Sequence, residues 1–208
     1  MRILVIGANG VIGKKIVKQL KELNHEPVAM IRKEGQANYF KNLGVLTVKA
    51  DLEKDFEHAF SNIDMVVFTA GSGSNTGADK TIIIDQEGAI ESMKLAKKYK
   101  VKHYMIISAM RADDPKNATS IKHYLYAKHR ADEYLKASGL TYTIIRPGLL
   151  TNNPGTGRVN LQEKLQVRGE IPREDVASVV THLIMNPRAK NKTFEVLEGN
   201  IPISKLLA

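Results

Sequence analysis

The sequence predicts an α/β fold, a single domain with a doubly wound, mostly parallel sheet and helices on both faces. Three observations lead to this prediction. Short apolar runs alternate with helical patterns over residues 1–148, glycines and prolines separate these segments, and a glycine-rich turn joins the first strand to the first helix. We expect one domain over residues 1–208, with a short substrate-side region within 149–208.

The first unit consists of a strand, a glycine turn and a helix. Residues 3–6 form a continuous apolar run, typical of a strand buried on both faces of a parallel sheet. Gly7, Gly10 and Gly13 follow at once, and a helix begins near Val11. The residues predicted to form its buried face are Ile12, Ile16, Leu20 and Leu23.

The glycine spacing, G-x-x-G-x-x-G, between a strand and a helix indicates a dinucleotide-binding turn. Gly7 permits a sharp turn, Gly10 places no Cβ against a pyrophosphate, and Gly13 lets the helix pack close to the strand. The phosphates then meet free N–H groups at the positive end of the helix. The alternative is an ordinary strand–helix turn whose glycines are required only for steric reasons.

The remaining elements are predicted from the same alternation. We expect strands at 27–31, 45–48, 64–68, 103–107, 142–145 and 193–197, and helices at 36–42, 55–60, 80–98, 121–138 and 173–185. The residues expected to face inward from the long helix at 80–98 are Ile83, Ala89, Ile90, Met93 and Ala96. Residues 151–158 are rich in Asn, Pro and Gly and are expected to form a loop.

Composition limits the function classes. The chain has no run of 18 apolar residues, which argues against a membrane span, and no cysteine, which excludes disulfides and thiolate chemistry. No metal-ligand spacing is present. The net charge of +9 would attract polyanions, but the lysine clusters lack interleaved aromatic residues, so we favour a solvated surface over nucleic-acid binding. Met1 leads straight into strand residues, and we expect a cytoplasmic protein.

The end of the second strand indicates which cofactor is preferred. An acidic side chain there binds the ribose hydroxyls of NAD, whereas a basic one pairs with the 2′-phosphate of NADP. Arg32 and Lys33 stand at this point, which favours NADP(H) over NAD(H) unless they are only surface charges. Asp51 follows the third strand and either accepts from the adenine amino group or caps the next helix.

Several stretches together resemble the short-chain dehydrogenase/reductase superfamily, in particular its atypical branch of NAD(P)-binding, epimerase/dehydratase-like proteins. The stretches that carry the resemblance are GANGVIG (7–13), DMVVFTAGSGSNTGADKT (64–81), YMIISAM (104–110), YLYAKHRAD (124–132) and SGLTYTIIRPG (138–148). The resemblance implies a Rossmann fold that binds a nicotinamide dinucleotide along the carboxyl edge of the sheet.

The resemblance also implies a catalytic set. Tyr124 and Lys128 match the Tyr-x-x-x-Lys motif and share one face of a helix, and Ser108 lies just past the fifth strand, where its hydroxyl could hold a substrate carbonyl. A lysine ammonium and a positive nicotinamide both stabilise phenolate, so the tyrosine can exchange a proton with substrate oxygen. Asp85 stands where most members have Asn, which alters the surroundings of Lys128 and the expected proton relay.

We therefore expect an NADP(H)-binding oxidoreductase acting on a small carbonyl or sugar-like substrate, as a monomer or homodimer without a membrane partner. One alternative is a non-catalytic NADP(H) sensor or regulator, in which Tyr124 and Lys128 only position the ribose; a weaker one is a nucleic-acid-associated protein. The expected cofactor contacts are Gly7, Asn9, Gly10, Val11, Ile12, Gly13, Arg32, Lys33, Asp51, Leu52, Thr69, Ala70, Gly71, Ser108, Lys128, Pro147 and Gly148.

Overall fold

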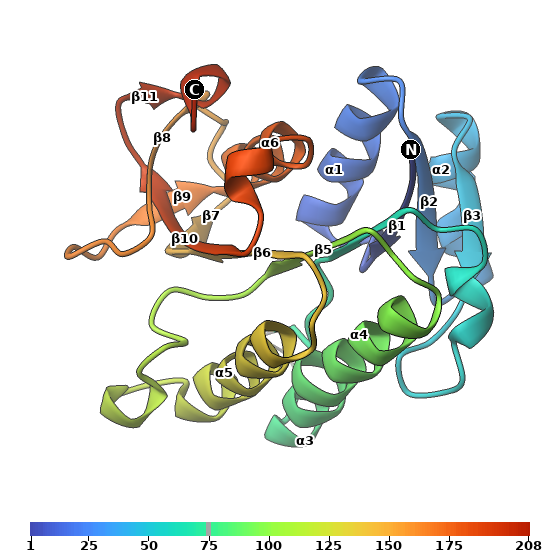
Figure 1. The fold of residues 1–208 in the computed structure, drawn as a ribbon, viewed down its shortest axis with the longest axis horizontal. Coiled ribbons are helices and arrows are strands. Elements are labelled where there is room, and N and C mark those ends of the chain that lie inside the picture. Colours follow the sequence, from blue (N-terminus) through green and yellow to red (C-terminus); the bar gives the residue numbers. More distant parts are fainter. Residues whose placement is uncertain (74–75) are drawn as a thin grey trace.

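The computed structural model describes residues 1–73 and 76–208 and contains one large, mostly parallel sheet (Figure 1). Its nine strands run in the order β11-β8-β10-β6-β5-β4-β1-β2-β3. The strands are β1 (Arg2–Ile6), β2 (Glu26–Ile31), β3 (Leu46–Lys49), β4 (Met65–Phe68), β5 (His103–Ile107), β6 (Tyr142–Pro147), β8 (Arg158–Gln162), β10 (Lys192–Glu198) and β11 (Ile201–Pro202). All neighbours from β3 to β10 pair in parallel, which confirms the predicted fold class.

Strand order reverses beside β1, and this reversal creates the crevice of the fold. The chain proceeds outward from β1 through β2 to β3, and then crosses to the other side of β1 to form β4. In open α/β sheets, ligands bind at such a switch point, outside the carboxyl ends of the strands. The glycine turn that follows β1 and the segment that follows β4 both lie at this edge of the sheet.

Helices cover both faces of the sheet (Figure 1). One face carries α1 (Val11–Glu22), α2 (Ala37–Asn42) and α6 (Arg173–Leu183). The other carries α3 (Ala78–Lys80), the π-helix η3 (Thr81–Gly88), α4 (Ala89–Lys98) and α5 (Lys122–Ala137). The short 3₁₀ segments are η1 (Glu34–Gln36), η2 (Glu57–Phe60), η4 (Pro115–Asn117), η5 (Pro187–Ala189) and η6 (Ile203–Lys205). Two apolar cores, one on each side of the sheet, result from this arrangement.

Two predicted core positions were wrong, and local geometry explains both. Ile83 was expected inside but is 37% exposed, while Ile84 is buried. The predicted continuous α-helix contains the π-helix η3, whose wider turn shifts the inward face relative to the 3.6-residue period. Leu23 is 54% exposed because α1 ends at Glu22, and Val17 is buried on the inner face instead.

The last third of the chain departs most from prediction. Strand β8 pairs antiparallel with β10, and β7 (Leu149–Thr151) pairs with β9 (Glu170–Pro172) in a second, two-stranded sheet. The expected loop beyond β7 is held against α6, because the Asp175 carboxylate accepts from the backbone N–H groups of Thr156 at 2.8 Å and Gly157 at 2.9 Å. These contacts join residues about 19 positions apart, which periodicity does not reveal.

Candidate active site

The glycine turn after β1 has steric requirements at two of its three glycines. Gly7 has a φ of +85°, and a Cβ there would lie 2.5 Å from the Ala70 backbone nitrogen; at Gly13 it would lie 2.3 Å from the Gly7 carbonyl oxygen. Gly10 differs, because its added Cβ would meet only the Gly7 oxygen, at 3.3 Å. The protein alone therefore demands glycine less strictly at position 10, where the backbone faces the crevice.

The start of α1 is suited to phosphate. Gly10 is its N-cap, no side chain caps the helix, and no acidic residue lies in the first turn. The first N–H groups of the helix are therefore available to an anion, with the positive end of the helix dipole behind them. Val11 is 55% exposed and Ile12 is 8% exposed with its side chain in the core, so Ile12 can contribute only its backbone to such a site.

A cavity of about 390 Å³ opens at the switch point. The predicted cofactor residues that line it are Gly7, Asn9, Gly10, Arg32, Asp51, Leu52, Thr69, Ala70 and Gly71. Lining residues that the sequence reasoning missed include Gln36, Glu53, Ser72, Thr76, Lys80 and Ile84. The predicted residues outside this lining are Val11, Ile12, Gly13, Lys33, Ser108, Lys128, Pro147 and Gly148. Its walls therefore come from the ends of β1, β2, β3 and β4 and from η1, α3 and η3.

Gln36 fixes the backbone of Arg32 and Lys33, the basic residues that follow β2 at the edge of the cavity. Its side-chain oxygen accepts from the backbone N–H of Arg32 at 2.9 Å and of Lys33 at 3.0 Å, which fixes the turn after β2. The nearby Glu34 faces Lys49 at 3.9 Å, and within the described ranges no carboxylate pairs with Arg32. Its guanidinium is thus available to a ligand anion at the cavity edge.

The Asp51 side chain stabilises a local turn and does not cap η2, the next helical segment. Its carboxylate accepts from the Glu53 backbone N–H at 3.2 Å, whereas Asp55 accepts from Glu57 at the start of η2. Glu53 also pairs with Lys80 at 2.5 Å. Because both residues line the cavity, this ion pair joins the segment after β3 to the helix after β4.

Tyr124, Lys128 and Asp85 come together on the facing sides of α5 and η3. The Lys128 Nζ lies 2.9 Å from Asp85 Oδ1 and 5.5 Å from the centre of the Tyr124 ring. Both charged side chains are buried, at 3% and 0% exposure. Burial alone would lower the pKa of the Lys128 ammonium, but electrostatic interaction with the Tyr124 oxygen and with the Asp85 carboxylate outweighs burial, and the pKa is raised.

The second Asp85 oxygen ties this pair to the cavity wall. Asp85 Oδ2 accepts from the Ser72 backbone N–H at 2.8 Å, and Ser72 lines the cavity. A Cβ on Gly71 would lie 3.1 Å from Asp85 Oδ1. The Asp85 carboxylate therefore neutralises Lys128 and holds the segment after β4.

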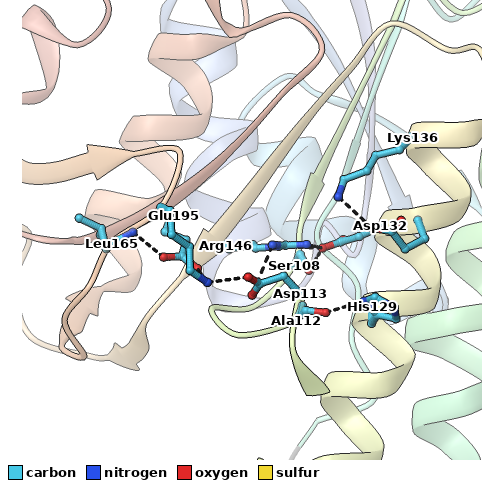
Figure 2. A network of polar contacts seen from close by, with 11 residues as sticks. Ser108, Ala112, Asp113, His129, Asp132, Lys136, Arg146, Leu165 and Glu195 are labelled. Carbon is cyan, nitrogen blue, oxygen red and sulfur yellow. Dashed lines mark hydrogen bonds and ion pairs between the residues drawn. The ribbon is translucent and has the colours of Figure 1, made fainter. Parts of the chain in front are cut away.

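Ser108 is bound to a residue that the sequence reasoning missed. Its hydroxyl donates to Asp132 Oδ2 at 2.9 Å, and the Arg146 guanidinium contacts the same oxygen through Nε at 2.9 Å and Nη2 at 2.8 Å (Figure 2). Burial raises the pKa of Asp132 above its ordinary value, against the opposing effect of Arg146. The sequence did offer one indication of Asp132: it lies four residues after Lys128 and so shares one face of the same helix.

A network of charged side chains continues from Arg146 to the segments around Asp113 and Lys164 (Figure 2). Arg146 lies 3.6 Å from Asp113, which pairs with Lys164 at 2.5 Å; Lys164 in turn lies 3.2 Å from Glu195. Glu195 is 1% exposed and also accepts from the Leu165 backbone N–H at 2.7 Å. The segments around Asp113 and Lys164 are thus fastened to β6 and β10.

Pro147 is the last residue of β6, directly after Arg146, and Gly148 follows it. A Cβ on Gly148 would lie 2.3 Å from the Leu197 side chain and 2.4 Å from the Gly169 oxygen, so packing alone requires glycine there.

In the part of the chain that the structure describes, no group of three or more His, Cys, Asp or Glu residues could hold a metal ion. Within the same part, no helix is both long and apolar enough to cross a membrane.

Comparison with known proteins gives a consistent assignment. Residues 7–187 match the model of the NAD(P)H-binding family. The uncharacterized sugar epimerase YhfK of Bacillus subtilis is 41% identical over 212 residues, covering 100% of this chain and 99% of that protein. Sanguinarine reductase of Eschscholzia californica is 35% identical over 121 residues, 54% of this chain and 44% of that enzyme.

A solved structure agrees with the fold. A Bacillus halodurans protein, inferred to be an NAD-dependent epimerase/dehydratase, has a TM-score of 0.96 and 45% identity, covering 100% of this chain and 98% of that one. The glycine turn, the open helix N-terminus and the cavity at the switch point provide what a nicotinamide dinucleotide needs. This chain belongs to the NAD(P)H-binding family.

Proposed function

We propose that this protein is an NADP(H)-dependent oxidoreductase of the atypical short-chain dehydrogenase/reductase type, acting on a small carbonyl or sugar-like substrate. The observation that carries the proposal is the buried Lys128–Asp85 pair beside Tyr124, adjoining the wall of the dinucleotide cavity. Perturbed buried charges next to a ligand cleft are typical of functional sites. The names of the relatives, a sugar epimerase and a reductase, support this class of chemistry.

In this proposal each residue has a defined task. The backbone from Gly7 to Gly13 holds the diphosphate, and Asp51 and Leu52 contact the adenine. Thr69, Ala70 and Gly71, which line the cavity, would face the nicotinamide half of the cofactor, and Pro147 and Gly148, which lie outside the lining, would border it. When bound, the cofactor supplies or accepts a hydride. Tyr124 exchanges a proton with the substrate oxygen, and Lys128 stabilises the phenolate and contacts the ribose.

The preference for NADP(H) rests on Arg32, with Lys33 beside it. A planar guanidinium pairs well with the 2′-phosphate, and Arg32 has no competing carboxylate in the described residues. We expect Arg32→Ala to weaken NADPH binding by about tenfold and to leave NADH binding nearly unchanged, because only NADPH carries the phosphate. Equal losses for both nucleotides would contradict the preference.

The reaction is tested with NADPH and a panel of aldehydes, quinones and hydroxyketones, comparing the wild type with Tyr124→Phe. We expect the variant to bind NADPH normally and to lose at least about a hundredfold in kcat, the scale of general acid–base catalysis. Lys136→Gln, on the exposed face of the same helix, is the control. Full activity of Tyr124→Phe would remove Tyr124 from the mechanism.

A second candidate is an NADP(H) sensor or regulator without turnover. The observation that favours it is that Asp85 already neutralises Lys128 and Asp132 already binds Ser108. Steady NADPH binding with no turnover across the panel would select this candidate. In either case we propose that residues 1–208 work as one unit, in the cytoplasm, as a monomer or homodimer.

A further inference from the structure

The Gln36 side chain has a fixed orientation in the turn after β2. Its Oε1 accepts from the backbone N–H groups of Arg32, at 2.9 Å, and Lys33, at 3.0 Å. These backbone groups can only donate, so the amide oxygen must face them and the Nε2 group lies on the other side of the amide. Gln36 lines the cavity, and within the described residues its Nε2 donates to no protein acceptor. The two hydrogens on Nε2 are therefore available to a ligand.

The side chains beside this amide favour an anion. Arg32 lines the same cavity, and in the described parts of the chain no carboxylate pairs with its guanidinium. Glu34, two residues after Arg32, faces Lys49 at 3.9 Å and is not part of the cavity lining. A guanidinium and an amide nitrogen offer only N–H donors, which match the oxygens of a phosphate.

The two carboxylates in the cavity lining are committed to other groups. Asp51 accepts from the Glu53 backbone N–H at 3.2 Å, and the Glu53 carboxylate pairs with Lys80 at 2.5 Å. Neither of them forms an ion pair with Arg32. The charge at the edge of the cavity after β2 is therefore decided by the side chains of the turn itself.

Residue 36 is a position where a single atom changes that charge. A glutamate there has nearly the same shape, and its carboxylate would accept from the same two backbone N–H groups. It would also replace the Nε2 hydrogens by a negatively charged oxygen, which attracts the Arg32 guanidinium and repels a phosphate. An acidic side chain after the second strand of this kind of sheet instead accepts from ribose hydroxyls.

Resting on the proposed function, we propose that Gln36 is a specificity-determining residue that makes the cavity select a ribose phosphate monoester over a free ribose hydroxyl. The amide oxygen holds the backbone of Arg32 and Lys33, and the amide nitrogen donates to a phosphate oxygen. Because the amide is neutral, the Arg32 guanidinium stays available to the same phosphate. The ligand class is an adenine dinucleotide with a 2′-phosphate.

The test measures the affinities of NADPH and NADH by calorimetry, because the two nucleotides differ only in the 2′-phosphate. We expect the wild type to bind NADPH at least about tenfold more tightly than NADH. Gln36→Glu should reduce this preference at least about tenfold through weaker NADPH binding, with NADH binding as tight as before or tighter. An unchanged preference in Gln36→Glu, or an equal loss for both nucleotides, would overturn the inference.

Gln36→Met separates selection from bracing of the turn. Methionine keeps the length of the side chain but removes the two hydrogen bonds and the Nε2 donors without adding charge, so its preference should lie between those of the wild type and Gln36→Glu. If Gln36 only braced the turn, Gln36→Met would weaken both nucleotides equally and Gln36→Glu would weaken neither. Should Gln36→Glu not fold, an equal loss for both nucleotides in Gln36→Met would still overturn the inference.

Asn38→Asp is the matched control. It introduces the same negative charge two residues later, at an exposed position of α2 that is outside the cavity lining. Because salt screens exposed charges, this variant should keep the wild-type preference within about twofold. A loss as large as that of Gln36→Glu would assign the effect to net charge and overturn the role of the Gln36 amide.

The outcomes distinguish this inference from the proposed function. A preference that falls in Gln36→Glu, in a protein that turns over no substrate, would contradict only the oxidoreductase activity. Turnover with NADPH and an unchanged preference in Gln36→Glu would contradict only the role of Gln36. A wild type that binds NADH at least as tightly as NADPH would overturn both this inference and the proposed cofactor preference.

Discussion

The cavity at the switch point and the buried ion pairs beside it differ in how polar groups are held. The cavity exposes the backbone at Gly7, Gly10 and Ala70, and its Glu53–Lys80 ion pair is 29% and 39% exposed. Beside the cavity, and outside its lining, Lys128–Asp85 and Arg146–Asp132 are buried ion pairs with at most 5% exposure. A dinucleotide brings its own charge and needs N–H donors, whereas the proposed proton chemistry needs charged side chains held in place.

The difference has energetic consequences. Removing one partner of a buried ion pair leaves an uncompensated charge and costs about 3–5 kcal/mol, whereas exposed pairs contribute about 0–1 kcal/mol. Substitutions in the buried ion pairs should therefore lower the free energy of unfolding, whereas substitutions in the cavity lining should mainly weaken dinucleotide binding. Each of the following experiments addresses one side of this contrast.

The largest effect is expected from Arg146→Leu. The change leaves the Asp132 carboxylate buried without its cation, so the free energy of unfolding should fall by about 3–5 kcal/mol. Urea denaturation measures this, with Lys98→Gln as the control, because its pair with Glu57 is exposed. A comparable loss in the control variant would remove the contrast between buried and exposed pairs.

His103, the first residue of β5, should make the stability of the fold sensitive to acid. Burial, with a smaller effect of Lys190, lowers its pKa from 6.5 to about 4, so the unfolded chain binds a proton between these values and the folded chain does not. The free energy of unfolding is therefore unaffected by His103 above pH 6.5. It falls as the pH drops toward about 4, by about 3 kcal/mol in total. His103→Gln should flatten this part of the stability curve; an unchanged curve would contradict the assignment.

Gly10→Ala should separate dinucleotide binding from stability in the cavity lining. The backbone φ of Gly10 is −68°, which alanine tolerates, and the added Cβ meets only one oxygen at 3.3 Å. We expect little change in Tm and a loss of at least about tenfold in NADPH affinity, because the Cβ lies where the pyrophosphate must approach. Gly35→Ala, where a Cβ meets nothing within 4 Å, is the control and should bind NADPH normally.

The smallest effect is expected at the Glu53–Lys80 pair, which joins two walls of the cavity. Glu53→Gln and Lys80→Gln should each accelerate NADPH dissociation by about two- to fivefold, the range of a partly exposed ion pair. Stopped-flow fluorescence gives the rate, with Lys98→Gln as the control. If Glu53→Gln slows dissociation while Lys80→Gln accelerates it, the pair acts through net charge and does not restrain the walls.

The sequence by itself determined the parallel sheet, the glycine turn and the place of Tyr124 and Lys128, because strand alternation, turn chemistry and i,i+4 spacing are local properties. It did not determine the π-helix that exposes Ile83, or the antiparallel β8, because backbone register there depends on distant packing. The convergence of Asp132 and Arg146 on Ser108 was decided only by the tertiary structure. A buried charge is stable only where other elements bring its counter-charge, and no local pattern encodes that meeting.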